Sequence, residues 1–189
     1  MNLIKSKKYL NKIISSNVYD VAIPTPLYPT QYLSRRLENN VLLKREDLQP
    51  VFSFKIRGAY NKISLLKNRG AIERVVAASA GNHAQGVAYS SKKLGIKATI
   101  VMPITTPTIK IRAVRNLGAK VVLKGDNFDD AYAYAVRLSE KPNVTFVHPY
   151  DDHDVIAGQG TIGKEILEEH PESLEAIFVP VGGGGLLAG

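Results

Sequence analysis

The regular alternation of strand-like and helix-like segments from residue 75 onward most strongly limits what this chain can fold into. Short runs rich in valine, isoleucine and alanine predict strands, and the longer amphipathic segments between them predict helices. Strands that alternate with helices form a parallel sheet covered by helices on both faces. The predicted fold class is therefore α/β.

The segments can be assigned in chain order. The expected strands are residues 75–78, 98–102, 120–123, 145–147 and 176–179, and the expected helices are residues 82–94, 106–118, 126–139 and 155–169. An earlier helix should be capped by Ser53, carry Lys55 in its first turn and end near Asn68. In parallel sheets, ligands bind beyond the carboxyl ends of the strands. The turns that follow strands 75–78 and 176–179 are therefore the candidate binding site.

Composition fits a globular protein and excludes several classes. The chain has 189 residues, of which 44% are hydrophobic, and it has no cysteine for a disulfide, a thiolate nucleophile or a cysteine metal site. No apolar run approaches the roughly 18 residues of a membrane span, so a cytoplasmic location is the expectation. The four histidines show no metal-ligand spacing, and no metal is expected.

Charge is unevenly distributed along the chain. Residues 1–75 carry 14 basic and 5 acidic side chains, whereas residues 76–189 carry 11 and 12. A basic first half is compatible with a phosphate- or nucleic-acid-binding module. However, no aromatic stacking platform interleaves these lysines, so a solvated basic face is the preferred interpretation and no nucleic-acid or membrane partner is expected.

Lys55 is the candidate reactive residue. It lies in the segment S-F-K-I-R-G-A-Y at residues 53–60, at the start of the expected helix. Considered alone, a lysine here is more simply a solvated residue in the first turn of an amphipathic helix. Two later segments favour a functional role for its amine.

The first of these is the glycine run Gly182–Gly185, followed by Leu186. Consecutive glycines leave main-chain N–H groups free to converge on an anion, and the positive end of a following helix favours the same ligand. The alternative is a flexible turn. The run is not a P-loop, because no Lys-Ser or Lys-Thr follows the last glycine.

The second is the turn Ser79-Ala80-Gly81-Asn82-His83, between a predicted strand and a predicted helix. The N–H groups at such a turn suit a carboxylate, and the Asn82 side chain suits a ring hydroxyl. Simple helix capping by Ser79 or Asn82 is the alternative. His83 is interpreted as a packing or capping residue without an acid–base role.

A competing pattern is Gly158, Gly160 and Gly163, which spell the dinucleotide-binding fingerprint G-x-G-x-x-G. That fingerprint requires a preceding strand and an acidic residue on a second strand about 20 positions later. Neither is present, so these glycines are predicted to be close-packing positions in a helix.

Together the three segments supply an amine for an aldehyde, a polar partner for a ring and a cradle for a phosphate, which are the requirements of pyridoxal phosphate. The segments S-F-K-I-R-G-A-Y, S-A-G-N-H-A-Q-G and V-G-G-G-G-L, in this order and separation, resemble threonine dehydratase of the fold-type II pyridoxal-phosphate enzymes. The segments T-P-L (25–27) and K-R-E-D-L-Q-P-V (44–51) resemble the biosynthetic branch more than catabolic or racemase relatives.

The resemblance implies specific roles for the site residues. Lys55 would bind pyridoxal 5'-phosphate covalently and act as the catalytic base. Asn82 would contact the ring hydroxyl, and the turn formed by Ser79, Ala80, Gly81 and Asn82 would bind the substrate carboxylate. The phosphate would be bound by Gly182, Gly183, Gly184, Gly185 and Leu186. The implied reaction is α,β-elimination of L-threonine, or of L-serine in a catabolic type, to a 2-oxo acid and ammonia, in isoleucine biosynthesis for the biosynthetic type.

The resemblance also implies a domain organisation. Residues 52–147 would form the smaller α/β domain of the tryptophan synthase beta-like fold, and residues 1–51 and 148–189 only part of the larger, truncated one. Family members continue beyond the glycine run with a partner for the pyridine nitrogen and an effector-binding domain, and form homotetramers. A truncated remnant that binds cofactor without catalysis therefore remains an alternative.

Overall fold

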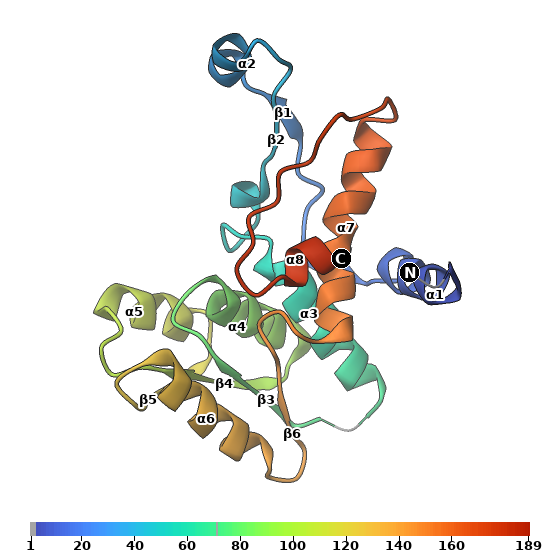
Figure 1. Ribbon diagram of the computed structural model, residues 1–189. Helices are drawn as coiled ribbons and strands as arrows, with labels where there is room; N and C mark the ends of the chain where they lie inside the picture. Colours follow the sequence, from blue (N-terminus) through green and yellow to red (C-terminus); the bar gives the residue numbers. More distant parts are fainter. Residues whose placement is uncertain (1–2, 71) are drawn as a thin grey trace.

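The computed structural model of this chain describes residues 3–70 and 72–189. Its central layer is a four-stranded sheet with the strand order β5-β4-β3-β6, and all three pairings are parallel (Figure 1). The strands are β3 (Arg74–Ala78), β4 (Lys97–Met102), β5 (Lys120–Leu123) and β6 (Val144–Phe146). The predicted parallel sheet is confirmed.

Both faces of this sheet are covered by helices, as predicted. Successive side chains of β3 point to opposite faces, so Val75 and Ala77 enter one apolar cluster and Val76 and Ala78 another. The second cluster is closed by α6 (Phe128–Ser139). The first is closed by α3 (Lys55–Asn68), α4 (Asn82–Leu94) and α5 (Thr108–Asn116), and it also contains Val155 of the later helix α7 (His153–Glu169).

Helix α3 lies between α4 on one side and the long helix α7 on the other. The crossing with α7 is close because both helices present glycine at it. A Cβ atom on Gly158 of α7 would lie 2.7 Å from the Cα atom of Gly58. Glycine therefore permits an approach of α3 to α7 that any larger residue would prevent.

The other elements flank this body. They are α1 (Leu3–Ile14), η1 (Val18–Asp20), β1 (Leu27–Pro29), α2 (Gln31–Leu37), β2 (Leu42–Lys44), η2 (Glu46–Leu48) and α8 (Gly185–Ala188). Strands β1 and β2 form an antiparallel pair that projects away from the body together with α2, whereas α1 and α8 lie against α7 (Figure 1). None of the helices in the described ranges is both long enough and apolar enough to cross a bilayer.

One predicted strand is wrong. Residues 176–179 form neither strand nor helix, and Phe178 is 95% exposed. An apolar run becomes a strand only where a neighbouring strand accepts its backbone hydrogen bonds, and no strand in the described part of the chain pairs with this one. The glycine run therefore follows an extended segment instead of a strand.

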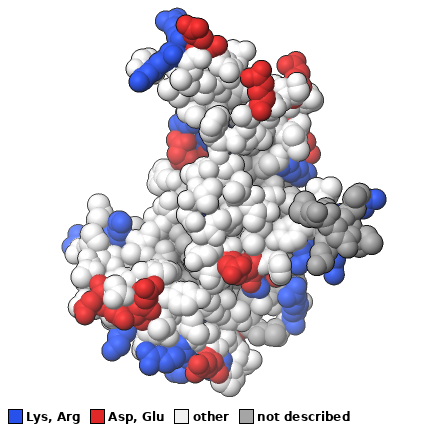
Figure 2. All heavy atoms as spheres, in the orientation of Figure 1, with Lys and Arg blue, Asp and Glu red and all other residues white. Residues whose placement is uncertain are grey.

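Charged side chains are intermixed on the face drawn in Figure 2. Lysine and arginine stand beside acidic residues at the top and at the lower part of this face, with a broad uncharged area between them. On this face the basic residues form no continuous surface of the kind that nucleic acid requires.

Candidate active site

The amine of Lys55 is held within the molecule at the start of α3. Its Nζ donates a hydrogen bond of 2.7 Å to the carbonyl oxygen of Pro149. Burial lowers the pKa of this amine. Lys55 is therefore not the solvated lysine that its residue type alone favours.

The backbone of Lys55 is fixed by its neighbours. A Cβ atom on Gly86 of α4 would lie 3.0 Å from the carbonyl oxygen of Lys55, so the two helices are in direct contact at this residue. The hydroxyl of Ser53 accepts a hydrogen bond of 3.3 Å from the N–H of Lys55. The prediction that Ser53 is the N-cap is wrong, because the N-cap is Phe54, one residue later. Ser53 still provides an acceptor for the first N–H group of α3.

The turn between β3 and α4 is fixed by hydrogen bonds at Ser79 and has unbonded N–H groups at the start of α4. Ser79 N–H donates to the carbonyl oxygen of Val101, and the Ser79 hydroxyl accepts from the N–H of Gly81. Asn82 is the first residue of α4 and its side chain is exposed. Among the described residues, the N–H groups of Asn82 and His83 have no acceptor, so this helix start has donors available for a carboxylate.

His83 is a packing residue, as predicted. It is 3% exposed, and its Nε2 lies 2.9 Å from the carbonyl oxygen of Val147, just beyond the carboxyl end of β6. A carbonyl oxygen only accepts, so Nε2 carries the proton and Nδ1 is left without a partner in the described part of the chain. Burial, with a smaller effect from the nearby Lys55 charge, lowers the pKa of His83 to about 4.

The glycine run forms a loop that packs on Tyr150. Gly184 has the left-handed φ of 82° that favours glycine. Cβ atoms on Gly183 and Gly185 would lie 2.3 Å from the Tyr150 ring and 2.6 Å from its carbonyl oxygen, respectively. The N–H groups of residues 182–185 have no acceptor among the described residues, so the loop presents free donors.

The segment Pro149–Tyr150 brings the predicted parts of the site together. Pro149 binds the amine of Lys55, and Tyr150 lies against the glycine loop. Sequence reasoning missed both residues. The signal that could have found them is their position just after β6, because the carboxyl ends of β3 and β6 meet at the same edge of the sheet.

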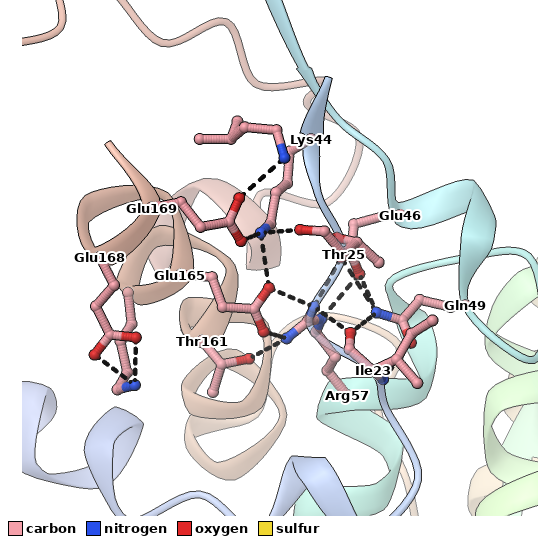
Figure 3. A network of polar contacts seen from close by, with 12 residues as sticks. Ile23, Thr25, Lys44, Glu46, Gln49, Arg57, Thr161, Glu165, Glu168 and Glu169 are labelled. Atoms are coloured by element: carbon pink, nitrogen blue, oxygen red, sulfur yellow. Dashed lines mark hydrogen bonds and ion pairs between the residues drawn. The ribbon is translucent and has the colours of Figure 1, made fainter. Parts of the chain in front are cut away.

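Sequence reasoning also missed Arg57, the centre of a buried ionic network (Figure 3). Its guanidinium is fully buried and binds Glu46 at 2.8 Å and Glu165 at 2.5 Å. Lys44 pairs with Glu165 at 2.9 Å. Burial opposes the charge of Arg57, but its hydrogen bonds to both carboxylates outweigh this effect and raise its pKa. The network fixes the first turn of α3, and with it Lys55, to α7.

The glycines of the dinucleotide-like pattern lie inside α7. Gly158 contacts the backbone of α3, and a Cβ on Gly160 would lie 2.6 Å from Ile13. The prediction of close packing is therefore confirmed for these two. It is wrong for Gly163, around which there is open space.

The residues present suit pyridoxal phosphate. The cofactor requires an amine that is partly neutral, and burial lowers the pKa of the Lys55 amine. It also requires a phosphate cradle, and residues 182–185 provide free N–H groups with no side chain between them and a ligand.

Residues 18–189 match the family described as "Pyridoxal-phosphate dependent enzyme". The chain therefore belongs to this family, and pyridoxal phosphate is the family's cofactor, as the resemblance implied.

Within the family, the chain is similar to biosynthetic threonine dehydratases. It is 55% identical over 187 residues to "L-threonine dehydratase biosynthetic IlvA" of Burkholderia multivorans, covering 97% of this chain and 37% of that protein. It is also 55% identical over 188 residues to "Threonine dehydratase biosynthetic, chloroplastic" of Arabidopsis thaliana, covering 100% of this chain and 32% of that protein. The chain thus spans about a third of the length of these relatives.

Solved structures agree in fold. The processed form of threonine deaminase isoform 2 from Solanum lycopersicum superposes with a TM-score of 0.94 at 52% identity, covering 99% of this chain and 51% of that one. A pyridoxal 5'-phosphate-dependent aspartate racemase superposes with a TM-score of 0.87 at 34% identity, covering 96% and 56%. Proteins with differently named activities share this fold, so the fold alone does not select a reaction.

Proposed function

We propose that this chain carries the cofactor-binding lysine of a pyridoxal-phosphate-dependent ammonia-lyase. The reaction is α,β-elimination of L-threonine to 2-oxobutanoate and ammonia, as a step of isoleucine biosynthesis. The observation that carries the proposal is the amine of Lys55, which is hydrogen-bonded to Pro149 at the edge of the sheet where the glycine loop packs. The identity of 55% to threonine dehydratases supports the choice of substrate.

Each predicted site residue has a role in this proposal. Lys55 binds the cofactor covalently, and the N–H groups of Gly182–Gly185 and Leu186 bind its phosphate. Asn82 contacts the ring hydroxyl, and the N–H groups of the turn Ser79–Asn82 bind the substrate carboxylate. This arrangement is supported by the free donors at both places.

The protein's own part of the chemistry is to position and deprotonate the substrate. Pyridoxal phosphate, when bound, supplies the electron-withdrawing ring that stabilises negative charge at the substrate α-carbon. Once the substrate amine has replaced Lys55 on the cofactor, the released Lys55 amine would accept the α-proton, which requires its neutral form. Burial lowers its pKa, and the first turn of a helix disfavours positive charge, so both effects increase the neutral fraction of this amine. Pro149 provides the acceptor that orients this amine.

Two alternatives differ from this proposal. A catabolic-type dehydratase acting on serine and threonine would share the same fold, and a fungal L-serine ammonia-lyase superposes with a TM-score of 0.80 at 33% identity. The other alternative is a remnant that binds the cofactor without catalysis. Comparing turnover of L-threonine with that of L-serine separates the first alternative from the proposal. A protein that is labelled at Lys55 but turns over neither substrate is the remnant.

The decisive experiment is covalent labelling of Lys55. The protein is incubated with pyridoxal phosphate, reduced with borohydride and mapped by peptide mass spectrometry, with Lys55→Ala and the exposed Lys93→Ala as matched variants. We expect one dominant label on Lys55 in the wild type and in Lys93→Ala, and none at this position in Lys55→Ala. Label spread evenly over many lysines would overturn the proposal.

We also propose that the full-length protein is a cytoplasmic homotetramer that acts on a small molecule, with no nucleic-acid or membrane partner. Some relatives are named as chloroplastic or mitochondrial proteins, so the location varies within the family. Light scattering and cell fractionation of the full-length protein test these points.

A further inference from the structure

Two neighbouring residues contact both halves of the candidate site. Pro149 accepts the hydrogen bond from the Lys55 amine, and the next residue, Tyr150, lies against the glycine loop. A ligand that binds the amine at one end and the loop at the other must match the separation between them. The position of this segment therefore sets that separation.

Tyr150 supports two of the four glycines. A Cβ atom on Gly183 would lie 2.3–2.5 Å from three atoms of the Tyr150 side chain, so the ring is in van der Waals contact with the Gly183 backbone. Gly185 contacts the Tyr150 backbone, where a Cβ atom would lie 2.6 Å from the carbonyl oxygen. The glycine loop thus packs directly on Tyr150.

The ring of Tyr150 is itself held in place by His148. The two rings meet edge to face with centroids 4.7 Å apart, and Nδ1 of His148 accepts a hydrogen bond of 2.7 Å from the N–H of Asp151. His148 in turn contacts Phe146 and Tyr132, with centroid distances of 6.0 Å to each. A continuous row of aromatic rings therefore links Tyr150, which contacts the glycine loop, to the apolar cluster between the sheet and α6.

The contact depends on the ring and not on the phenol hydroxyl. Among the described residues the Tyr150 hydroxyl has no hydrogen-bond partner, and all three close atoms at Gly183 are ring carbons. Phenylalanine would preserve this contact, whereas alanine would leave a space beneath the loop into which Gly183 could relax.

We infer that Tyr150 is a positioning residue that holds the glycine loop in the conformation that recognises a phosphate group. This inference rests on the proposed function, because it assigns the phosphate of the cofactor to the loop. Tyr150 acts through the backbone of Gly183 and Gly185 and does not itself bind the anion. Its loss should therefore weaken recognition of the phosphate more than recognition of the rest of the cofactor.

The test compares two ligands that differ only in the phosphate. Dissociation constants for pyridoxal 5'-phosphate and for pyridoxal are measured by equilibrium dialysis with the natural full-length protein, Tyr150→Phe and Tyr150→Ala. We expect the preference for the phosphorylated ligand to fall about tenfold in Tyr150→Ala, equivalent to about 1.4 kcal/mol, and to stay within about twofold in Tyr150→Phe. Circular dichroism establishes that each variant is folded.

A substitution on the other side of the contact, at Gly183, distinguishes loss of this contact from general misfolding. Gly183→Ala places a methyl group against the Tyr150 ring and should abolish the phosphate preference, whereas Tyr150→Ala provides space for that methyl group. The double variant Gly183→Ala/Tyr150→Ala should therefore recover part of the preference that Gly183→Ala loses. Strictly additive losses would overturn the inference.

The outcomes separate this inference from the proposed function. If the wild type binds pyridoxal phosphate at Lys55 with a strong phosphate preference that Tyr150→Ala retains, the role of Tyr150 is wrong and the proposed function stands. If the wild type shows no preference between the two ligands, the phosphate assignment of the glycine loop is wrong, and the inference about Tyr150 is overturned with it.

Discussion

The imidazole of His83 is buried in its neutral form, so its ionisation must oppose folding. Burial lowers its pKa from 6.5 to about 4, although the hydrogen bond to Val147 partly counteracts this effect. Between these two values the unfolded chain binds a proton that the folded chain does not. The free energy of unfolding should therefore decrease by about 3 kcal/mol as the pH falls through this range.

This dependence can be isolated with His83→Gln, whose amide retains a donor for the carbonyl of Val147 but does not titrate. Urea unfolding of both proteins at several pH values between 7 and 4 gives the difference, in which the contribution of His148, also lowered in pKa by burial, largely cancels. We expect the wild type to lose stability relative to His83→Gln as the pH falls. Parallel curves for the two proteins would show that His83 is not the titrating group.

At the level of secondary-structure elements, the crossing of α3 and α7 depends on glycine. A Cβ atom on Gly158 would lie 2.7 Å from the Arg57 carbonyl oxygen and from the Gly58 Cα, which are backbone atoms that cannot rotate away. Gly158→Ala should therefore reduce the free energy of unfolding by about 1–3 kcal/mol despite the better helix propensity of alanine.

Gly163 provides a matched control in the same helix. Its surroundings are open, so Gly163→Ala gains helix propensity without a clash and should stabilise the protein by up to about 1 kcal/mol. Urea denaturation of the two variants should thus give changes of opposite sign. Equal effects would mean that the α3–α7 crossing can relax, and that glycine is not required there.

Helix boundaries in this chain could be predicted because their signals are local. Helix α4 begins at Asn82 and ends at Leu94, and Gly95 follows with the left-handed φ of 69° that a helix end requires. The strand expected at residues 176–179 could not be judged in the same way, because a strand depends on a distant partner. For the same reason the contact between Tyr150 and Gly183 was missed, since no local pattern links these two positions.

At the level of the whole molecule, the network around Arg57 joins parts that are distant in sequence. We propose that residues 52–147 form the smaller domain, with residues 1–51 and 148–189 in the larger one. Arg57 belongs to the former, whereas its partners Glu46 and Glu165 belong to the latter. The network therefore crosses the proposed boundary and fixes α3, with Lys55 in its first turn, to the larger domain.

Removing Arg57 should destabilise the molecule strongly. Burial alone would raise the pKa of Glu165, but hydrogen bonds from Arg57 and Lys44 outweigh this effect and lower it. Arg57→Met would leave the buried carboxylate of Glu165 and the partly buried carboxylate of Glu46 without this partner, at a cost of about 3–5 kcal/mol. Lys164→Met serves as the control. It breaks the pair between Lys164 and Glu168 on α7, which is more exposed than the Arg57–Glu165 pair, and it should change the free energy of unfolding by less than about 0.5 kcal/mol.

A double-variant cycle shows whether this cost comes from unpaired charge or from lost packing. In Arg57→Met/Glu165→Met both buried charges of the pair are replaced by apolar side chains, so the double variant should be less destabilised than the sum of its two single variants by at least about 1 kcal/mol. Urea unfolding at pH 7 measures all four proteins. If the two effects simply add, the Arg57–Glu165 pair is not coupled, and the packing of α3 on α7 would then depend on the glycine crossing and not on the charges beside it.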